Sequence, residues 1–263
     1  MRYAKKSLGQ NFLIDKNIIK KIVDLVEITN LNIVEIGPGR GALTDQILSR
    51  HPKSLTLVEK DNQLSNELEL KYKKYKNVKI FNKDILKFNL EKQIKQNTII
   101  FGNLPYNISS QILVKMIKFK NWPPKYLSLI FMFQKEMAER IVGKFGSSNY
   151  GRLSILTKYR ISICDSFNIS PKCFFPQPKI ISTILHLKPK EKNSTKIKNI
   201  RNLEKLTSIL FSNKRKMINK NIKKIFKKTN LYKSLEDLNL KSRPSELSPE
   251  TYYKLTELFE KIN

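Results

Sequence analysis

The sequence has few cysteines, no long hydrophobic run and few acidic residues, and each shortage excludes a class of protein. Cys164 and Cys173 are the only cysteines among 263 residues, so they can build neither a disulfide framework nor a four-ligand zinc site. The longest strongly apolar run, Leu127–Phe133, is far shorter than the roughly 20 residues that cross a bilayer. No apolar signal segment follows the basic N-terminal residues. We therefore expect a cytoplasmic protein that is neither secreted nor membrane-bound and holds no metal.

The shortage of acidic residues leaves a large positive charge. Lys and Arg number 51 against 22 Asp and Glu, a formal net charge of +29, while 40% of the residues are hydrophobic. This composition is typical of a globular protein with a polyanionic partner. Residues 188–233 hold 16 Lys and Arg against 2 acidic residues, a local charge of +14. A coding bias toward lysine is an alternative source of much of the charge, but not of its placement.

The densest basic run predicts a contact with nucleic acid. Its side chains are expected to lie along one helix and to contact phosphates on successive turns. A solvated lysine-rich helix is the alternative. The candidate RNA-binding residues are Lys214, Arg215, Lys216 and Lys220, followed by Lys223, Lys224, Lys227 and Lys228.

The hydrophobic pattern predicts an α/β fold with a small C-terminal all-helical domain. Short apolar runs alternate with helical stretches, which indicates a parallel sheet covered by helices, and two further β-rich stretches could form an antiparallel edge. The predicted strands are 33–36, 55–58, 78–81, 98–101 and 127–133, and the later stretches are 154–168 and 180–187. We expect a first domain over 1–187, a polar linker over 188–194 and a helical domain over 195–263.

Two helices of the C-terminal part can be placed more closely. Leu203, Leu206 and Leu210 share one face with Ile209 and predict an amphipathic helix. Ser248 as N-cap, followed by Pro249, predicts the start of the last helix.

A glycine-rich turn predicts a cofactor site. Residues Gly37 to Gly41 read Gly-Pro-Gly-Arg-Gly between a predicted strand and a helix, so the backbone can approach a ligand without Cβ obstruction. Glu59 ends the next strand, where an acidic side chain accepts hydrogen bonds from ribose hydroxyls. An ordinary strand-to-helix turn and a surface carboxylate are the alternatives.

A second acidic residue favours a mononucleoside cofactor over NAD. Asp84 ends the third predicted strand, where its carboxylate could accept from an adenine amino group while the N–H of Ile85 donates to the ring. A turn or N-cap role for Asp84 is the alternative.

The sequence Asn103-Leu104-Pro105-Tyr106 is the most specific signal in the chain. The lone pair of an exocyclic base amine is delocalised into the ring, so acceptors must hold its hydrogens and steer the nitrogen toward an electrophile. The Asn103 amide oxygen and the backbone carbonyl of Leu104, held extended before proline, could do so. Tyr106 offers a face on which an extruded base stacks. A simple strand-end turn is the alternative.

These motifs resemble the small-subunit ribosomal RNA adenine N6,N6-dimethyltransferase (KsgA-type) family over nearly the whole chain. The similar segments are Gly9–Leu13, Val34–Gly39, Gly102–Ser109, Tyr150–Ser154 and Phe174–Lys179. The resemblance implies a Rossmann-like class I fold and S-adenosyl-L-methionine as cofactor, with Asn11, Leu13 and Asn103 contacting the cofactor. It also implies that Phe174 stacks on the flipped adenine opposite Tyr106, with Phe175 as the rival for that role.

The resemblance implies dimethylation of two adjacent adenosines in a 3′-terminal hairpin of small-subunit rRNA, by a monomer acting on the small ribosomal subunit or its precursor. Because the sulfonium is already an activated electrophile, positioning and desolvation should suffice, and neither His51 nor His186 is assigned a catalytic role. Two alternatives remain. One is the related large-subunit rRNA adenine methyltransferase, and the other is a noncatalytic RNA-binding assembly factor.

Overall fold

A computed structural model describes residues 10–191, 196–227, 229, 231–235 and 238–262. Gly9, Lys228 and part of the predicted linker 188–194 lie outside these residues. The packing divides the chain into two compact units: unit 1 contains residues 1–138 and 162–189, and unit 2 contains residues 139–161 and 190–263. Each of these units is made of two separate stretches of sequence, whereas the predicted domains 1–187 and 195–263 are continuous. The domain boundaries therefore stay a prediction.

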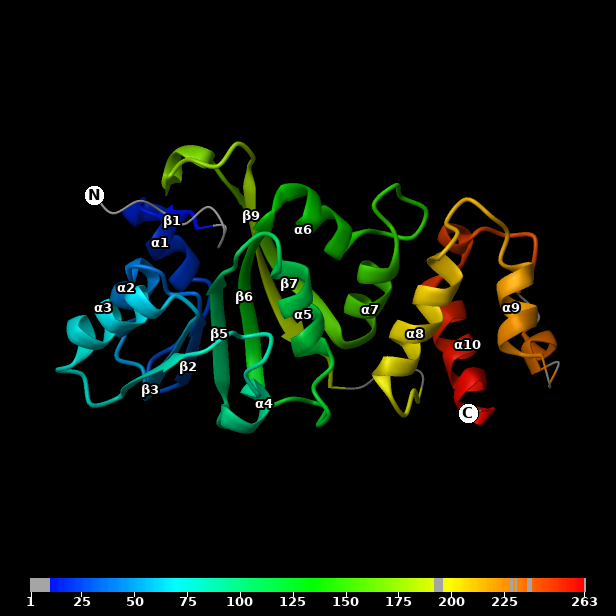
Figure 1. The fold of residues 1–263 in the computed structure, drawn as a ribbon, viewed down its shortest axis with the longest axis horizontal. Coiled ribbons are helices and arrows are strands. Elements are labelled where there is room, and N and C mark those ends of the chain that lie inside the picture. The colour runs from blue at the N-terminus through cyan, green and yellow to red at the C-terminus, as the bar shows by residue number, and fades with distance from the viewer. Residues whose placement is uncertain (1–9, 192–195, 228, 230, 236–237, 263) are drawn as a thin grey trace. The chain divides into compact units, whose positions relative to one another are not determined.

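Unit 1 is an α/β fold built around a seven-stranded sheet with the order β4-β3-β2-β5-β6-β9-β7 (Figure 1). The first five strands of the sheet are parallel, and each contains one of the five predicted strands. The strands are β2 (Asn32–Ile36), β3 (Ser54–Glu59), β4 (Val78–Asn82), β5 (Thr98–Asn103), β6 (Tyr126–Gln134), β7 (Ile161–Ile169) and β9 (Ser182–Pro189). β9 pairs antiparallel with β6, which confirms the predicted antiparallel edge.

The helices of unit 1 connect these strands and cover them. They are α1 (Lys16–Val23), α2 (Ala42–Leu48), α3 (Asn62–Tyr72), α4 (Leu90–Gln93), α5 (Ser109–Ile117) and α6 (Lys135–Val142), whose second half belongs to unit 2. Alternate strand residues such as Ile33, Leu57 and Phe101 form one core with α1, α2 and α3, because successive side chains of a strand point to opposite faces. In Figure 1 these three helices lie together beside the strands.

A two-stranded antiparallel sheet completes unit 1. It joins β1 (Phe12–Leu13) to β8 (Phe174–Phe175), which follows the 3-10 turn Pro171–Cys173. Segments more than 150 residues apart in the sequence therefore lie side by side, as the pairing of Phe12 with Phe175 shows.

Residues 152–160 form helix α7 (Arg152–Arg160), so the prediction of a strand that begins at Ser154 was wrong. The Ser154 hydroxyl accepts a hydrogen bond from the Gly151 N–H and donates one to the Gly151 carbonyl, which caps the start of the helix. Six of the nine residues of α7 are buried, so the helix is packed on most of its sides. The β-branched and aromatic residues of this stretch suggested a strand, but this tertiary packing overrides local propensity.

Unit 2 packs α7 with α8 (Ile200–Phe211), α9 (Asn219–Ile225) and α10 (Pro249–Lys261). Short 3-10 turns at Leu231–Ser234 and Pro244–Glu246 connect α9 to α10. The predicted apolar face of α8 is confirmed at Leu203, Leu206 and Leu210, which are buried. Ser248 caps α10 through the N–H of Thr251, with Pro249 at its first position, as predicted. No helix among the described residues is both long and apolar enough to cross a membrane.

Candidate functional site

A cavity of about 640 Å³ lies in unit 1 at the carboxyl ends of strands β2, β3 and β5. This edge of a parallel sheet is where ligands bind in open α/β folds. The structure places nearly all of the predicted cofactor and catalytic residues in its lining. They are Asn11, Leu13, Gly37, Gly39, Glu59, Asp84, Ile85, Asn103, Leu104, Pro105 and Tyr106.

The glycine turn fits closely against its surroundings. Gly37 and Gly39 have positive φ angles of 68° and 58°, a conformation that favours glycine. A Cβ atom on Gly37 would lie 3.4 Å from the Asn103 carbonyl oxygen, and one on Gly39 would lie 3.0 Å from the Phe12 ring. Both positions therefore need glycine for their backbone conformation, and Gly39 needs it also for the close approach of the Phe12 ring.

Glu59 is held rigidly at the end of β3. One carboxylate oxygen accepts from the Gly39 N–H at 3.2 Å, and the other accepts from the Asp61 N–H at 2.8 Å. The side chain is buried, and this burial raises the pKa of Glu59. A carboxylate oriented in this way by the turn can accept hydrogen bonds from a ligand hydroxyl in the cavity.

Asp84 lies two residues beyond β4, in the loop that leads to Ile85. Its Oδ2 pairs with the Lys60 ammonium at 2.9 Å, and its Oδ1 accepts from the Leu86 N–H at 2.9 Å. The hydrogen bond from Lys60 lowers the pKa of Asp84. Lys115 of α5 supports the same loop, because its ammonium donates to the carbonyls of Leu86 and Phe88 at 2.8 and 2.7 Å.

The end of β5 brings the Asn-Leu-Pro-Tyr segment to the cavity. The Asn103 amide nitrogen donates to the Asn11 carbonyl at 3.0 Å, which orients the amide and leaves its oxygen as the acceptor for a ligand. The Tyr106 hydroxyl lies 2.6 Å from the Ser182 hydroxyl of β9, so the ring is held from a second segment. Burial raises the pKa of Tyr106, which keeps the phenol protonated.

The two phenylalanines of β8 face in opposite directions. Phe174 is 2% exposed and packs in the hydrophobic core with Leu13, outside the cavity lining. Phe175 is 44% exposed and lines the cavity. Neighbouring strand residues alternate between faces, so only one of the pair can reach a base. The structure thus places the rival residue Phe175, and not Phe174, at the cavity.

A buried carboxyl group lies at the floor of the cavity, beneath the glycine turn. Glu35 of β2 is 1% exposed and accepts a hydrogen bond of 2.6 Å from the Thr44 hydroxyl. Burial raises the pKa of Glu35 from 4.5 to about 8, because an ionised carboxylate is poorly solvated there. At neutral pH this group is therefore mostly protonated.

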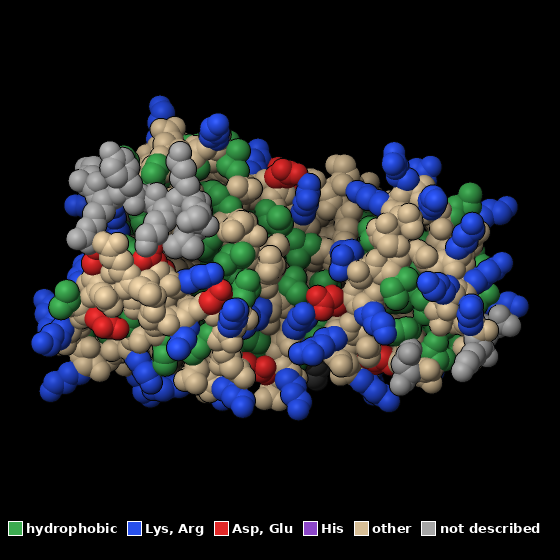
Figure 2. Space-filling model, viewed as in Figure 1, with side chains coloured by type: hydrophobic (Ala, Val, Ile, Leu, Met, Phe, Trp, Pro, Cys, Tyr) green, Lys and Arg blue, Asp and Glu red, His purple; other side chains and the backbone are tan. Residues whose placement is uncertain are grey.

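The basic residues of unit 2 do not lie on one continuous helix as predicted. Lys214, Arg215 and Lys216 occupy the turn between α8 and α9, and Lys220 lies in the first turn of α9. Residues 212–217 are all exposed, so no apolar side chain anchors a helix there, and Asn221 caps the end of α8 through the Ile209 carbonyl. The basic side chains remain exposed, and Figure 2 shows Lys and Arg outnumbering acidic side chains across this face of unit 2.

Several residues that position the site were missed by sequence reasoning. Ser182 and Lys115 act through partners that are distant in the sequence, and Thr44 acts through Glu35, nine positions before it. No motif used in the sequence analysis marks these three residues. His186, which was assigned no catalytic role, is buried outside the cavity lining, with Nε2 3.0 Å from the Ser128 hydroxyl. Among the described residues, no group of three or more His, Cys, Asp or Glu side chains could hold a metal ion.

Comparison with known proteins relates the whole chain to one group of proteins. The sequence model of the family described as ribosomal RNA adenine dimethylase matches residues 1–261. The Ribosomal RNA small subunit methyltransferase A of Pelagibacter ubique (strain HTCC1062) is 45% identical over 259 residues, 98% of each chain. The protein of the same name from Francisella tularensis subsp. novicida (strain U112) is 43% identical over 93% of each chain.

Two solved structures have a similar fold over nearly the full length. A dimethyladenosine transferase from Plasmodium falciparum superposes with a TM-score of 0.77 at 27% identity, covering 95% of this chain and 98% of the other. The 23S rRNA methyltransferase ErmE superposes with a TM-score of 0.68 at 21% identity, covering 95% and 99%. The second likeness shows the fold alone.

Proposed function

This chain belongs to the ribosomal RNA adenine dimethylase family, and we propose that within this family it modifies the small-subunit rRNA. It is an S-adenosylmethionine-dependent methyltransferase with a Rossmann-like fold, and its substrate is an adenine of rRNA. The proposed targets are two adjacent adenosines in a 3′-terminal hairpin, each converted to N6,N6-dimethyladenosine during ribosome biogenesis. The observation that carries this proposal is the 45% identity, over 98% of both chains, to a small-subunit enzyme.

The residues of the cavity fit the cofactor. The glycine turn provides a surface free of Cβ atoms, Glu59 provides a fixed acceptor for ribose hydroxyls, and Asp84 provides an acceptor beside the Ile85 N–H for an adenine edge. When bound, S-adenosylmethionine supplies an activated methyl group on a cationic sulfur. We propose that Asn11 and Leu13 complete this part of the site from the N-terminal segment.

We propose that Asn103 orients the target amine. Its amide nitrogen is engaged by the Asn11 carbonyl, so its oxygen can accept an N–H of the adenine amine, and the Leu104 carbonyl before Pro105 can accept the other. Holding both hydrogens directs the nitrogen lone pair at the methyl group. Once the methylated amine has shed a proton to solvent, only one N–H remains, and Asn103 can still accept it.

We propose that the extruded adenine stacks between Tyr106 and Phe175. Both side chains line the cavity, whereas Phe174 is buried in the core. Stacking on aromatic faces replaces the neighbours that the base loses on leaving its RNA stack. The Ser182 hydroxyl fixes one side of this slot through the Tyr106 hydroxyl.

The substrate is tested with labelled S-adenosylmethionine and separated, unmodified ribosomal subunits. Label is expected in small-subunit RNA, and digestion to nucleosides should yield N6,N6-dimethyladenosine. Label found only in large-subunit RNA would reject the proposal and favour the large-subunit methyltransferase. Absence of label from both subunits, with tight RNA binding, would favour the noncatalytic assembly factor.

We also propose that the enzyme acts as a monomer in the cytoplasm. The single chain supplies every residue assigned above to the cofactor and the base, so the site needs no second copy. Sedimentation at the concentrations used for the assay tests the oligomeric state, and a dimer at those concentrations would contradict it.

A further inference from the structure

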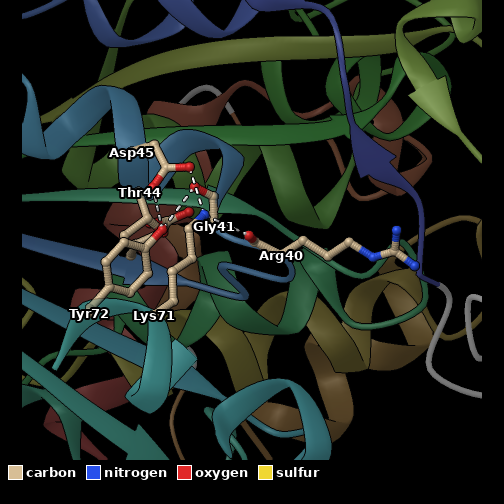
Figure 3. Close-up of polar contacts among 7 residues, drawn as sticks. Arg40, Gly41, Thr44, Asp45, Lys71 and Tyr72 are labelled. Atoms are coloured by element: carbon tan, nitrogen blue, oxygen red, sulfur yellow. Dashed lines mark hydrogen bonds and ion pairs between the residues drawn. The ribbon is translucent and has the colours of Figure 1, made fainter. Parts of the chain in front are cut away.

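The C-terminal end of helix α3 contacts the back of the glycine turn, away from any residue assigned above to the cofactor. Lys71 and Tyr72 are the last two residues of α3 and lie about thirty positions after the turn in the sequence. Figure 3 shows both side chains pointing at Gly41 and Asp45, with the backbone of Arg40 beside them. We call these five residues, Arg40, Gly41, Asp45, Lys71 and Tyr72, the turn clasp.

The contacts of the clasp converge on two backbone carbonyls and one carboxylate. The Tyr72 hydroxyl lies 3.1 Å from the Gly41 carbonyl oxygen and 2.7 Å from Asp45 Oδ1. The Lys71 ammonium lies 3.3 Å from the Arg40 carbonyl oxygen and 2.7 Å from Asp45 Oδ2. The single hydroxyl hydrogen of Tyr72 is shared between the Gly41 carbonyl oxygen and Asp45 Oδ1, whereas the Lys71 ammonium has a separate N–H for each of its two acceptors.

The clasp is built closely around glycine. Gly41 has a φ of 81°, and a Cβ atom there would lie 2.2 Å from the Tyr72 hydroxyl oxygen and 3.2 Å from the Lys71 ammonium. The third glycine of the turn is thus required by α3, whereas Gly39 is required by the Phe12 ring and Gly37 by its positive φ. The glycine-rich motif therefore accommodates two close neighbours, Phe12 and α3.

Burial separates the contributions of the two side chains. Tyr72 is 3% exposed, so its hydroxyl works where water does not compete. The side chains of Lys71 and Asp45 are 43% and 54% exposed, and an exposed ion pair contributes little. Tyr72 is therefore the principal member of the clasp, and Lys71 supports it.

Fixing these carbonyls fixes the turn that faces the cavity. A peptide unit is planar, so holding the carbonyl oxygens of Arg40 and Gly41 on the α3 side prevents the two peptide planes from rotating. The Gly41 N–H also donates to the Pro38 carbonyl at 2.9 Å, which closes the turn. Gly39, Arg40 and Ala42 of this turn line the cavity, as does Asp45.

We propose that Tyr72, with Lys71, is a positioning residue for cofactor binding: it holds the glycine turn in its binding conformation before the cofactor arrives. The inference rests on the proposed function, since it assigns the turn to S-adenosylmethionine. Pre-organised sites avoid the entropy cost of ordering a loop on binding. In this assignment Tyr72 contacts neither cofactor nor RNA and acts only through the glycine turn. Its replacement is therefore expected to change the affinity for the cofactor and not the affinity for RNA.

The test compares Tyr72→Phe with Tyr75→Phe. Both variants remove one phenolic hydroxyl, and each tyrosine has a lysine ammonium over its ring, at 5.1 Å for Lys71 and 5.3 Å for Lys74. Tyr75 is 37% exposed, and none of the hydrogen bonds of the clasp involves it. Its ring lies 6.1 Å from the Tyr72 ring between centroids, and Tyr75→Phe keeps this ring contact because it removes the hydroxyl alone. Lys71→Met and Lys74→Met form a second matched pair.

Binding of S-adenosylmethionine and S-adenosylhomocysteine is measured by calorimetry, without RNA. Tyr72→Phe should weaken both by about 5- to 30-fold, the range expected for losing a buried hydrogen bond that orders the turn. Lys71→Met should weaken binding by about two- to threefold, as for an exposed pair. The two control variants should bind as the wild type does.

Hydrogen exchange of the cofactor-free protein reports on the turn itself. The amides of Gly41 and Asp45 should exchange faster in Tyr72→Phe than in Tyr75→Phe, while the strand amides of β2 keep their protection. In steady-state assays the KM for cofactor should rise, with kcat and the KM for RNA unchanged. A purely structural role would instead lower the melting temperature and leave cofactor affinity as in Tyr75→Phe.

The outcomes distinguish this inference from the proposed function. If Tyr72→Phe and Tyr75→Phe bind the cofactor equally well, the positioning role is overturned even when rRNA is methylated. If Tyr72→Phe weakens cofactor binding while the wild type methylates no ribosomal RNA, the clasp stands and the proposed substrate fails.

Discussion

The cavity of unit 1 and the basic turn of unit 2 differ in how their polar side chains are held. In the cavity, Glu59 and Asn103 are held by partners from other segments, the Gly39 N–H and the Asn11 carbonyl. In the basic turn, Lys214, Arg215 and Lys216 are exposed to water and belong to no regular element. The first arrangement fixes geometry, and the second supplies charge.

This difference predicts how each region responds to substitution. Groups held in a fixed, partly buried geometry act as a unit, so losing one should cause a large and specific loss. Exposed cations contribute separately and are screened by salt, so losing several should cause a graded loss that depends on ionic strength. Affinity for RNA and selection of the base are therefore expected to be separable by mutation.

The largest effect is expected at Asn103. Asn103→Ala should reduce methyl transfer by at least about 10²- to 10³-fold, as on removing one pre-organised hydrogen-bonding group from an active site. Single-turnover rates with saturating RNA measure this loss. Cofactor affinity should stay within a few-fold of the wild type, and near-normal turnover would refute the orienting role of the amide.

The next effect separates the two neighbouring phenylalanines. Phe175→Ala should lower kcat/KM for RNA by about 5- to 150-fold, the range for loss of one base-stacking contact, with little change in melting temperature. Phe174→Ala should instead cost about 3–5 kcal/mol of folding stability, because it empties a core position. Thermal unfolding and steady-state kinetics of both variants decide the assignment. If Phe174→Ala lowered kcat/KM for RNA and Phe175→Ala lowered folding stability instead, Phe174 would be the residue that stacks on the base.

A smaller, graded effect is expected in the basic turn. Replacing Lys214, Arg215 and Lys216 with Ala should weaken RNA binding about tenfold at physiological salt and reduce the salt slope by about 2 to 3, one unit or slightly less per phosphate contact. The rate of methyl transfer at saturating RNA should not change.

A matched control for this variant removes three exposed lysines elsewhere in unit 2. Lys241, Lys254 and Lys261 are exposed, and the last two lie on α10 among Glu250, Glu257 and Glu260. Their replacement with Ala changes the net charge equally but should leave the salt slope closer to the wild type. Equal slopes for the two triple variants would show that placement of the charge does not matter.

A separate effect concerns stability and pH rather than binding or catalysis. The folded protein holds a proton on Glu35, whose pKa is about 8, while the unfolded chain releases it near 4.5. The stability associated with this proton is present below about pH 4.5 and is lost as the pH rises through about 8. The Gln side chain of Glu35→Gln cannot ionise and can still accept a hydrogen bond from Thr44. As the pH increases from about 5 to about 9, the melting temperature of this variant should therefore rise relative to that of the wild type. A constant difference over that range would contradict the raised pKa.

Much of the architecture followed from sequence patterns that act locally. The parallel strands were predicted because each is a short apolar run flanked by helical stretches, and the start of α10 because Ser248 and Pro249 form a cap. Helix α7 was missed because its residues favour strands when considered one by one. The tertiary structure buries six of its nine residues, and this packing, not a periodic apolar pattern, accompanies the helix.

The basic turn shows the opposite error. Its lysines and arginine have good helix propensity, and the sequence predicts one continuous helix through them. Propensity alone does not hold a short helix together in water without an apolar face to bury. Since residues 212–217 are all exposed, the chain turns between α8 and α9 at this point.

The sequence by itself determined the motifs of this protein: the glycine turn, Glu59, Asp84 and Asn103 through Tyr106 all lie in the cavity lining. Such residues can be recognised because their chemistry and spacing are set within one strand-turn-helix unit. The tertiary structure alone decided that Phe175 faces the cavity, that Ser182 holds Tyr106, and that α3 holds Gly41. These contacts join segments far apart in the chain, and their partners are fixed by packing, which no local pattern encodes.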